Sequence, residues 1–108
     1  MVATAFDRYQ RLVSSLEEHA GVEPGQMFGK ACLKIHGKAF VAQHKEVVVF
    51  KLTGPQHAQA IALAGANLWD PSGKGRPMRE WIALPAAQSG HYDSFASAAM
   101  AYVGGGAG

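Results

Sequence analysis

The feature that most constrains the fold is a change of hydrophobic period near residue 27. From there, apolar and polar side chains alternate through three short runs, at 31–36, 39–43 and 46–52. This is the period of strands with one buried face. Two residues separate each run from the next, whereas parallel neighbours need a crossover of about a dozen. The middle of the chain therefore predicts an antiparallel meander.

Helical patterns flank the meander. Apolar side chains recur at three- and four-residue steps over 6–16, the spacing of one helical stripe. Thr4 is the expected N-cap, and Asp7 favours the positive end of the helix dipole. A second helix is predicted from 53 to near 65, and a third presents Tyr92, Phe95, Ala99, Tyr102 and Val103 on one face.

Two further short strands are predicted at 67–70 and 78–84, joined by a turn at 70–73 whose Asp-Pro-Ser-Gly sequence suits type I. The expected order is α-β-β-β-α-β-β-α. This predicts an α+β two-layer sandwich with a five-stranded antiparallel sheet and segregated helices. We expect one domain over 1–103 and a flexible glycine-rich tail over 104–108.

Composition narrows the class of protein. The chain has 108 residues, 48% of them apolar, a net charge of +2 and one cysteine. These values exclude an intrinsically disordered chain and a disulfide scaffold. No apolar run approaches the ~20 residues of a membrane helix, and Asp7 and Arg8 interrupt any secretory signal. We expect a cytoplasmic protein with no membrane association.

The sheet is expected to have two apolar faces. The face that takes the helices is predicted to comprise Leu33, Ile35, Phe40, Val48, Phe50, Leu52, Ile82 and Leu84. The opposite face then carries Cys32, Lys34, Val41, Val47, Val49, Lys51 and Trp69 or Trp81. Two interpretations stay open. Loops or a helix cover this second face, or it is an open apolar patch rimmed by lysines for a homodimer or another protein partner.

Searches for reactive groups predict neither an enzyme nor a metal or cofactor site. No HExxH, GxSxG or phosphate-loop spacing occurs. His36 and His44 flank one predicted hairpin, which allows them to approach each other, but turn histidines are usually solvated. Cys32 is expected to be a small packing residue.

Basic residues suggest binding in two places. Residues 27–52 hold five lysines against Glu46, and a second cluster holds Lys74, Arg76 and Arg79 beside Trp81. The cluster suits an anion or an acidic partner surface, or its arginine stems simply cover the tryptophan.

The alternative function is weak nucleic-acid binding through the basic strands and the 74–79 loop. It would use Lys30, Lys34, Lys38, Lys45 and Lys51, with Phe28 or Trp81 stacking on bases. Lysines on solvent-facing strands also protect sheet edges.

Several motifs taken together resemble the TfoX/Sxy N-terminal domain family. They are Met27-Phe28-Gly29, KIHGKAFVAQ, EVVVFKL, Lys74-Gly75-Arg76-Pro77-Met78, and Trp81 leading to Leu84-Pro85. Their order and spacing cover about residues 5–103. The resemblance implies a two-layer fold similar to secretion chaperones and the YjbR-like group.

The family's named members regulate natural competence alongside the cyclic-AMP receptor protein, and no catalytic residue is established for them. Those regulators carry a second, C-terminal domain, so we expect here a stand-alone N-terminal domain that acts as a non-enzymatic interaction module. The candidate binding residues are Met27, Phe28, Gly29, Lys74, Gly75, Arg76, Arg79 and Trp81.

Overall fold

A computed structural model describes residues 4–75 and 77–105. Its elements are α1 (Ala5–Leu16), β1 (Val22–Met27), β2 (Lys30–Ile35), β3 (Lys38–His44), β4 (Val47–Lys51), α2 (Gly54–Ile61), β5 (Asn67–Trp69), β6 (Met78–Pro85), the 3₁₀ helix η1 (Ala86–His91) and α3 (Tyr92–Gly105). The strands form one antiparallel sheet in the order β1-β2-β3-β4-β6-β5. The α+β class, the antiparallel meander and the three helices are confirmed.

The prediction of five strands is wrong, because β1 makes a sixth. This strand contains Pro24 and Gly25, and its exposure does not alternate. Its sequence therefore lacks the two-residue period by which strands are found. β1 pairs only with β2, at the edge of the sheet, which is where a sheet tolerates proline.

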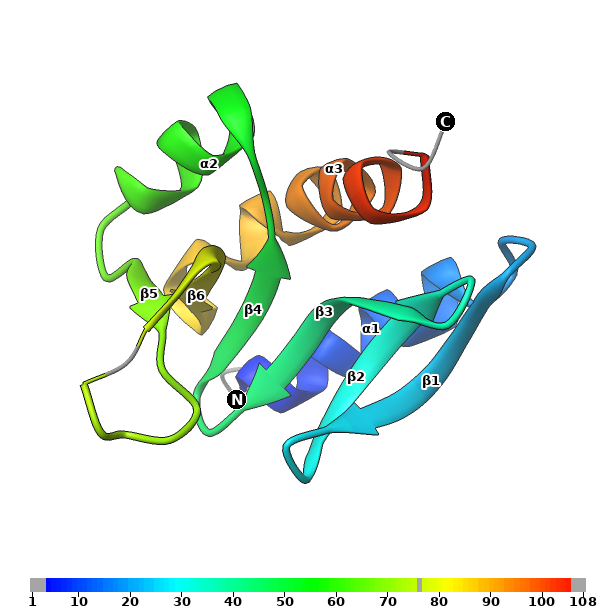
Figure 1. Ribbon diagram of the computed structural model, residues 1–108, viewed down its shortest axis with the longest axis horizontal. Coiled ribbons are helices and arrows are strands. Elements are labelled where there is room, and N and C mark those ends of the chain that lie inside the picture. Colours follow the sequence, from blue (N-terminus) through cyan, green and yellow to red (C-terminus); the bar gives the residue numbers. More distant parts are fainter. Residues whose placement is uncertain (1–3, 76, 106–108) are drawn as a thin grey trace.

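Two helices cover one face of the sheet. Figure 1 shows α1 behind β2 and β3, α3 above the strands in this view, and α2 beyond the end of β4. All eight side chains predicted for the helix-facing side of the sheet lie in the core beneath these helices: Leu33, Ile35, Phe40, Val48, Phe50, Leu52, Ile82 and Leu84. This part of the prediction is confirmed.

Val41 lies on the helix face, although the strict alternation of β3 assigns it to the opposite face. The register passes from Leu33–Val41 to Lys34–Ala39, so Phe40 is an extra residue in β3. Such a bulge places two successive side chains on nearly the same side of a strand. Phe40 and Val41 are both fully buried in the helix-side core as a result.

α1 begins as the sequence predicts. The Asp7 amide donates to the Thr4 hydroxyl, and the Thr4 amide donates to the Asp7 carboxylate, which together form a capping box. Tyr9, Leu12 and Leu16 are buried as the stripe predicts, but the buried face begins at Ala5, because Phe6 is 50% exposed.

Two glycines with positive φ shape different turns. Gly37, at φ +81°, follows His36 in the β2–β3 turn, and a Cβ added there would meet nothing within 4 Å. Gly65, at φ +83°, lies between α2 and β5, and a Cβ added there would lie 2.9 Å from Cγ of Pro85. Gly65 is therefore required for close approach as well as for backbone conformation.

α3 continues through Gly104 and Gly105, which the sequence places in a flexible tail. A Cβ on Gly104 would lie 2.8 Å from Cδ1 of Ile35, so this glycine lets the helix approach β2 closely. The remaining residues of the predicted tail, 106–108, lie outside the described part of the chain.

Candidate functional site

The sheet face opposite the helices, which we call the aromatic face, is largely covered by the chain itself. Its buried residues are Cys32, Ala42, Val49, Trp69, Trp81 and Ala83. The two indoles pack with the small side chains of β2, β3 and β4 and are only 3% and 7% exposed. The interpretation of this face as a wide open apolar patch is therefore wrong. A homodimer interface on this face stays a prediction.

Trp69 is the centre of an aromatic cluster. Its ring lies 5.6 Å from that of Trp81 and 6.2 Å, edge-on, from that of Phe28. Its indole Nε1–H donates a hydrogen bond of 3.0 Å to Nδ1 of His44. Because Phe28 sits between β1 and β2 while Trp69 ends β5, the cluster joins the two edges of the sheet.

Phe28 is the exposed member of this cluster. Its side chain is 60% exposed, and its φ of +52° precedes a φ of +74° at Gly29, the positive pair found in type I′ turns. A bulky residue in this conformation costs about 1–2 kcal/mol. The turn therefore holds an exposed aromatic ring in a backbone conformation that asparagine or glycine adopts more readily.

Cations surround the aromatic face. The register places Lys30 and Lys34 on the same side as Cys32, and Lys51 on the same side as Val49. On the other side of the sheet, Glu80 accepts a hydrogen bond from the hydroxyl of Tyr102 in α3.

Two contacts define the positions of the Lys34 and Lys30 side chains. The Lys34 side chain crosses Gly25, where an added Cβ would lie 3.1 Å from Cε. Nζ of Lys30 donates to the Phe28 carbonyl at 3.3 Å. One cation of this face thus holds the turn that carries the exposed ring.

The loop after Trp69 is organised by an internal carboxylate. Asp70 accepts hydrogen bonds from the amides of Ser72, Gly73 and Gly75 and from the Ser72 hydroxyl. The predicted turn is confirmed by the bond of 3.2 Å from the Gly73 amide to the Asp70 carbonyl. Since a carboxylate already occupies these amides, this loop is not a phosphate cradle.

The predicted site residues are brought together only in part. Phe28 and Trp81 meet through Trp69, and Met27 packs against the same cluster. Lys74 and Gly75 lie on the Asp70 loop, which starts directly after Trp69, while Arg76 lies outside the described residues. Sequence reasoning missed the central role of Trp69 and the contribution of His44.

His36 and His44 do not approach each other. They lie before and at the end of β3, so the strand separates them. Within 4–75 and 77–105, no group of three or more His, Cys, Asp or Glu side chains is placed to hold a metal ion. Cys32 is fully buried, and burial raises the pKa of its thiol, with Lys34 opposing. This fits the packing role predicted for it.

No protein-family model, curated protein or solved structure matches this chain. The resemblance to the TfoX/Sxy N-terminal domain family therefore stays a prediction. No helix in the described ranges has the length and apolar character needed to cross a bilayer.

The burial of His44 makes stability depend on pH. Burial lowers the pKa of His44 below its ordinary 6.5, and Lys30 and Lys45 lower it further. Between the folded and unfolded pKa values, His44 is therefore protonated in the unfolded chain but neutral in the native chain. Native stability is therefore retained above about pH 6.5 and falls as the pH drops toward the folded pKa.

We expect the free energy of unfolding, measured by urea denaturation, to decrease between roughly pH 7.5 and pH 5.5. In a His44→Gln variant this decrease is expected to be smaller, because the titrating group is gone. An unchanged pH profile in the variant contradicts the assignment to His44.

Proposed function

We propose that this chain is a non-enzymatic interaction module that binds an acidic segment of another protein at the aromatic face. Phe28 provides the apolar contact, and Lys30, Lys34 and Lys51 supply the charge. The observation that carries the proposal is the Phe28 ring, which is 60% exposed at a positive φ, beside a cationic face. An exposed residue held in a costly backbone conformation is typical of functional positions.

The charge of the face favours an acidic partner. The register gives the aromatic face three cations, Lys30, Lys34 and Lys51, and one acidic residue, Glu23, which lies opposite Lys34. Complementary charge speeds encounter and selects partners. Aromatic side chains at the centre of an interface commonly contribute the largest share of the binding energy.

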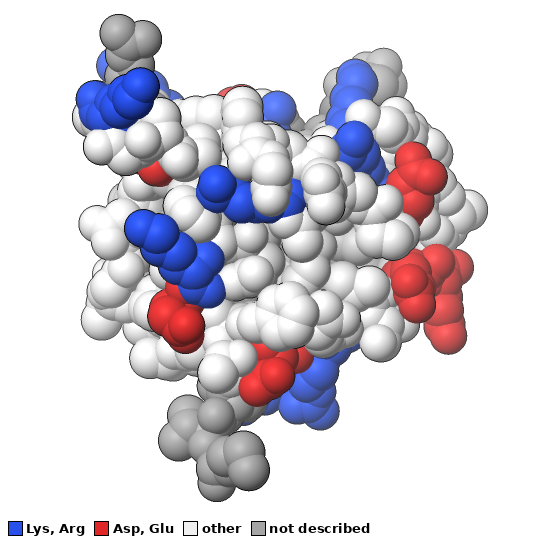
Figure 2. Space-filling model, turned by 90° about the horizontal axis from the view of Figure 1, so that it is seen from below, with Lys and Arg blue, Asp and Glu red and all other residues white. Residues whose placement is uncertain are grey.

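Nucleic-acid binding is the weaker candidate. Base stacking needs an accessible ring face, but Trp81 and Trp69 are buried and only Phe28 is exposed. Figure 2 shows lysines and arginines in separate groups, with neutral surface and carboxylates between them, on the side seen from below. A backbone-tracking protein presents a more continuous basic stripe.

Three finer points belong to the same proposal. The chain is cytoplasmic, and it acts as a regulator-like domain similar to the TfoX/Sxy N-terminal family. Its two-layer sandwich is related to those of secretion chaperones and the YjbR-like group, with β1 as an additional edge strand.

The test is a random peptide display library panned against the wild-type chain and three variants. Phe28→Asn removes the ring but leaves an Asn-Gly turn that suits the backbone. Lys51→Glu reverses one charge of the face. Phe6→Ala is the matched control, because Phe6 is an aromatic of similar exposure on α1.

Enriched peptides are expected to be acidic with at least one aromatic or large apolar residue. Their affinity should fall about tenfold or more in Phe28→Asn and Lys51→Glu, a loss of about 1.4 kcal/mol, and stay unchanged in Phe6→Ala. Peptides without acidic bias, or equal binding to all variants, overturn the proposal. Salt-sensitive binding of duplex or single-stranded DNA that Lys51→Glu abolishes would favour the alternative.

A further inference from the structure

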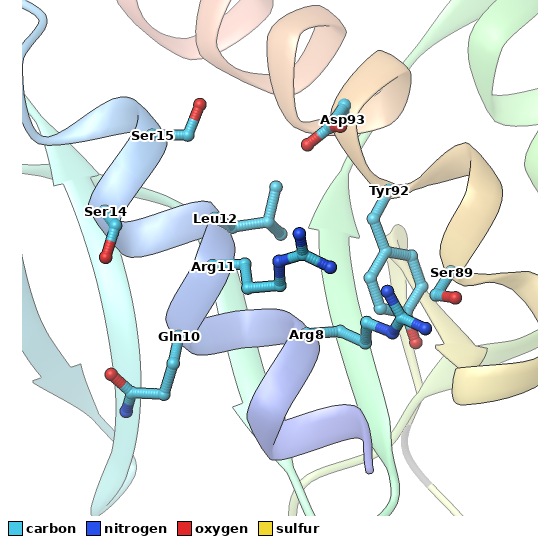
Figure 3. A pocket seen from close by; sticks show the side chains of 9 residues that line it. All are labelled: Arg8, Gln10, Arg11, Leu12, Ser14, Ser15, Ser89, Tyr92 and Asp93. Atoms are coloured by element: carbon cyan, nitrogen blue, oxygen red, sulfur yellow. The ribbon is translucent and has the colours of Figure 1, made fainter. Parts of the chain in front are cut away.

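A cavity of about 650 Å³ lies on the helix side of the molecule, between α1 and the segment from η1 into α3. Figure 3 shows the residues that line it, contributed by α1 on one side and by η1 and α3 on the other: Arg8, Gln10, Arg11, Leu12, Ser14, Ser15, Ser89, Tyr92 and Asp93. Its volume lies within the range of small-molecule sites, about 300–1,000 Å³. Because the helices cover the opposite side of the sheet, this cavity is separate from the aromatic face.

Three charged side chains line the cavity. In Figure 3 the guanidinium groups of Arg8 and Arg11 extend from α1 toward α3, and the carboxylate of Asp93 faces them from α3. Among the residues that the structure describes, none of these three side chains forms a hydrogen bond or an ion pair. Ser89 adds a hydroxyl beside Arg8.

The positive charges of Arg8 and Arg11 also repel each other along α1. Positions three residues apart are neighbours on a helical surface, and like charges there destabilise the helix. Asp7, the acidic residue closest in sequence, is engaged in the capping box with Thr4. An anion between the two guanidinium groups would relieve this repulsion with charge-assisted, bidentate hydrogen bonds.

The floor of the cavity consists of buried side chains. Leu12 and Tyr92 are buried, and the Tyr92 hydroxyl donates a hydrogen bond of 2.9 Å to the Leu84 carbonyl. Burial raises the pKa of Tyr92 to about 12, while the charge of Arg8 acts in the opposite direction. The floor therefore offers a neutral phenol fixed in orientation, on which a small ligand can rest.

We propose that this cavity binds a small organic anion, a carboxylate or phosphate ester that also carries a hydroxyl or amino group. Arg8 and Arg11 hold the anionic group. Asp93 accepts a hydrogen bond from the hydroxyl or amino group, which distinguishes such a ligand from a simple anion. The mostly polar lining excludes lipids and other large apolar ligands.

The experiment is a calorimetric titration with four probes at constant ionic strength: inorganic phosphate, glycerol 3-phosphate, acetate and lactate. Glycerol 3-phosphate differs from inorganic phosphate, and lactate from acetate, by carrying hydroxyl groups. Comparison of the two phosphate probes with the two carboxylate probes shows which anionic group the cavity prefers. The variants are Arg8→Gln with Arg11→Gln, Asp93→Asn alone, and Arg79→Gln as the control, since Arg79 is an exposed arginine of β6 that does not line the cavity.

Glycerol 3-phosphate or lactate is expected to bind with a saturable isotherm and more tightly than its simpler counterpart. The double arginine variant should weaken binding about tenfold or more. Asp93→Asn should reduce the advantage of the hydroxylated probe without weakening the simple anion, and Arg79→Gln should change neither. Because Arg11 and Asp93 are exposed and Arg8 is only half-buried, all variants are expected to fold, which circular dichroism checks.

Two results overturn the proposal. One is the absence of saturable binding for every probe in the millimolar range. The other is equal weakening by Arg79→Gln and by the arginine pair, which would indicate a general effect of net charge. Neither result bears on the peptide-binding experiment, because the two sites share no residue.

Discussion

Replacing Trp69 with alanine is expected to lower the free energy of unfolding by about 3–5 kcal/mol, the range for truncating a buried tryptophan. The side chain is only 3% exposed and contacts Phe28, His44 and Trp81. Its loss opens a cavity over the small residues of the central strands and leaves Nδ1 of His44 without its donor. Small domains are stable by only about 5–15 kcal/mol, so the variant should lie close to its unfolding threshold.

Urea denaturation followed by circular dichroism measures this effect. Trp69→Phe is the matched control, because it keeps an aromatic ring and removes the Nε1–H donor. Its expected loss is smaller, with the missing hydrogen bond contributing about 1 kcal/mol. A loss below about 1 kcal/mol in Trp69→Ala would show that the indole does not pack as described.

Gly65→Ala is the second substitution with a large expected effect. The positive φ costs an alanine about 1–2 kcal/mol. The new Cβ would also lie 2.9 Å from Cγ of Pro85, and because a proline ring has no rotamer that moves it aside, the backbone must shift. Overpacking of this kind adds about 1–3 kcal/mol.

Gly37→Ala separates the two contributions. Gly37 has nearly the same φ, +81° against +83°, but open space at the Cβ position. The free energy of unfolding of Gly37→Ala should therefore fall only by the conformational cost of the positive φ, about 1–2 kcal/mol. Denaturation midpoints of the two variants give the comparison, and equal losses would contradict the close approach to Pro85.

Local signals in the sequence predicted much of the fold. The capping residues Thr4 and Asp7, the two-residue turns of the meander and the helix-facing side chains of the sheet are properties of short segments, and the structure confirms them. The sequence pattern did not predict β1, because Pro24 and Gly25 interrupt the alternation of polar and apolar residues in this strand. Its pairing is decided by β2, which a local pattern cannot show.

The candidate site was harder to predict because it depends on contacts distant in sequence. Phe28 meets Trp69 across 41 positions, and Trp69 bonds His44 across 25. The alternation of polar and apolar residues identified the second sheet face but did not show that the indoles themselves bury it. The bulge at Phe40, which moves Val41 to the helix side, likewise became visible only in the register between β2 and β3.

The position of both tryptophans has a practical consequence. The sequence contains only these two indoles, and both lie on the aromatic face, in contact with each other and away from the α1–α3 cavity. Intrinsic fluorescence excited in the indole band is therefore a spectroscopic reporter of one side of the molecule. A peptide that covers Phe28 should change the emission, whereas a small anion between Arg8 and Arg11 should leave it unaltered, so the unlabelled protein can distinguish the two binding events.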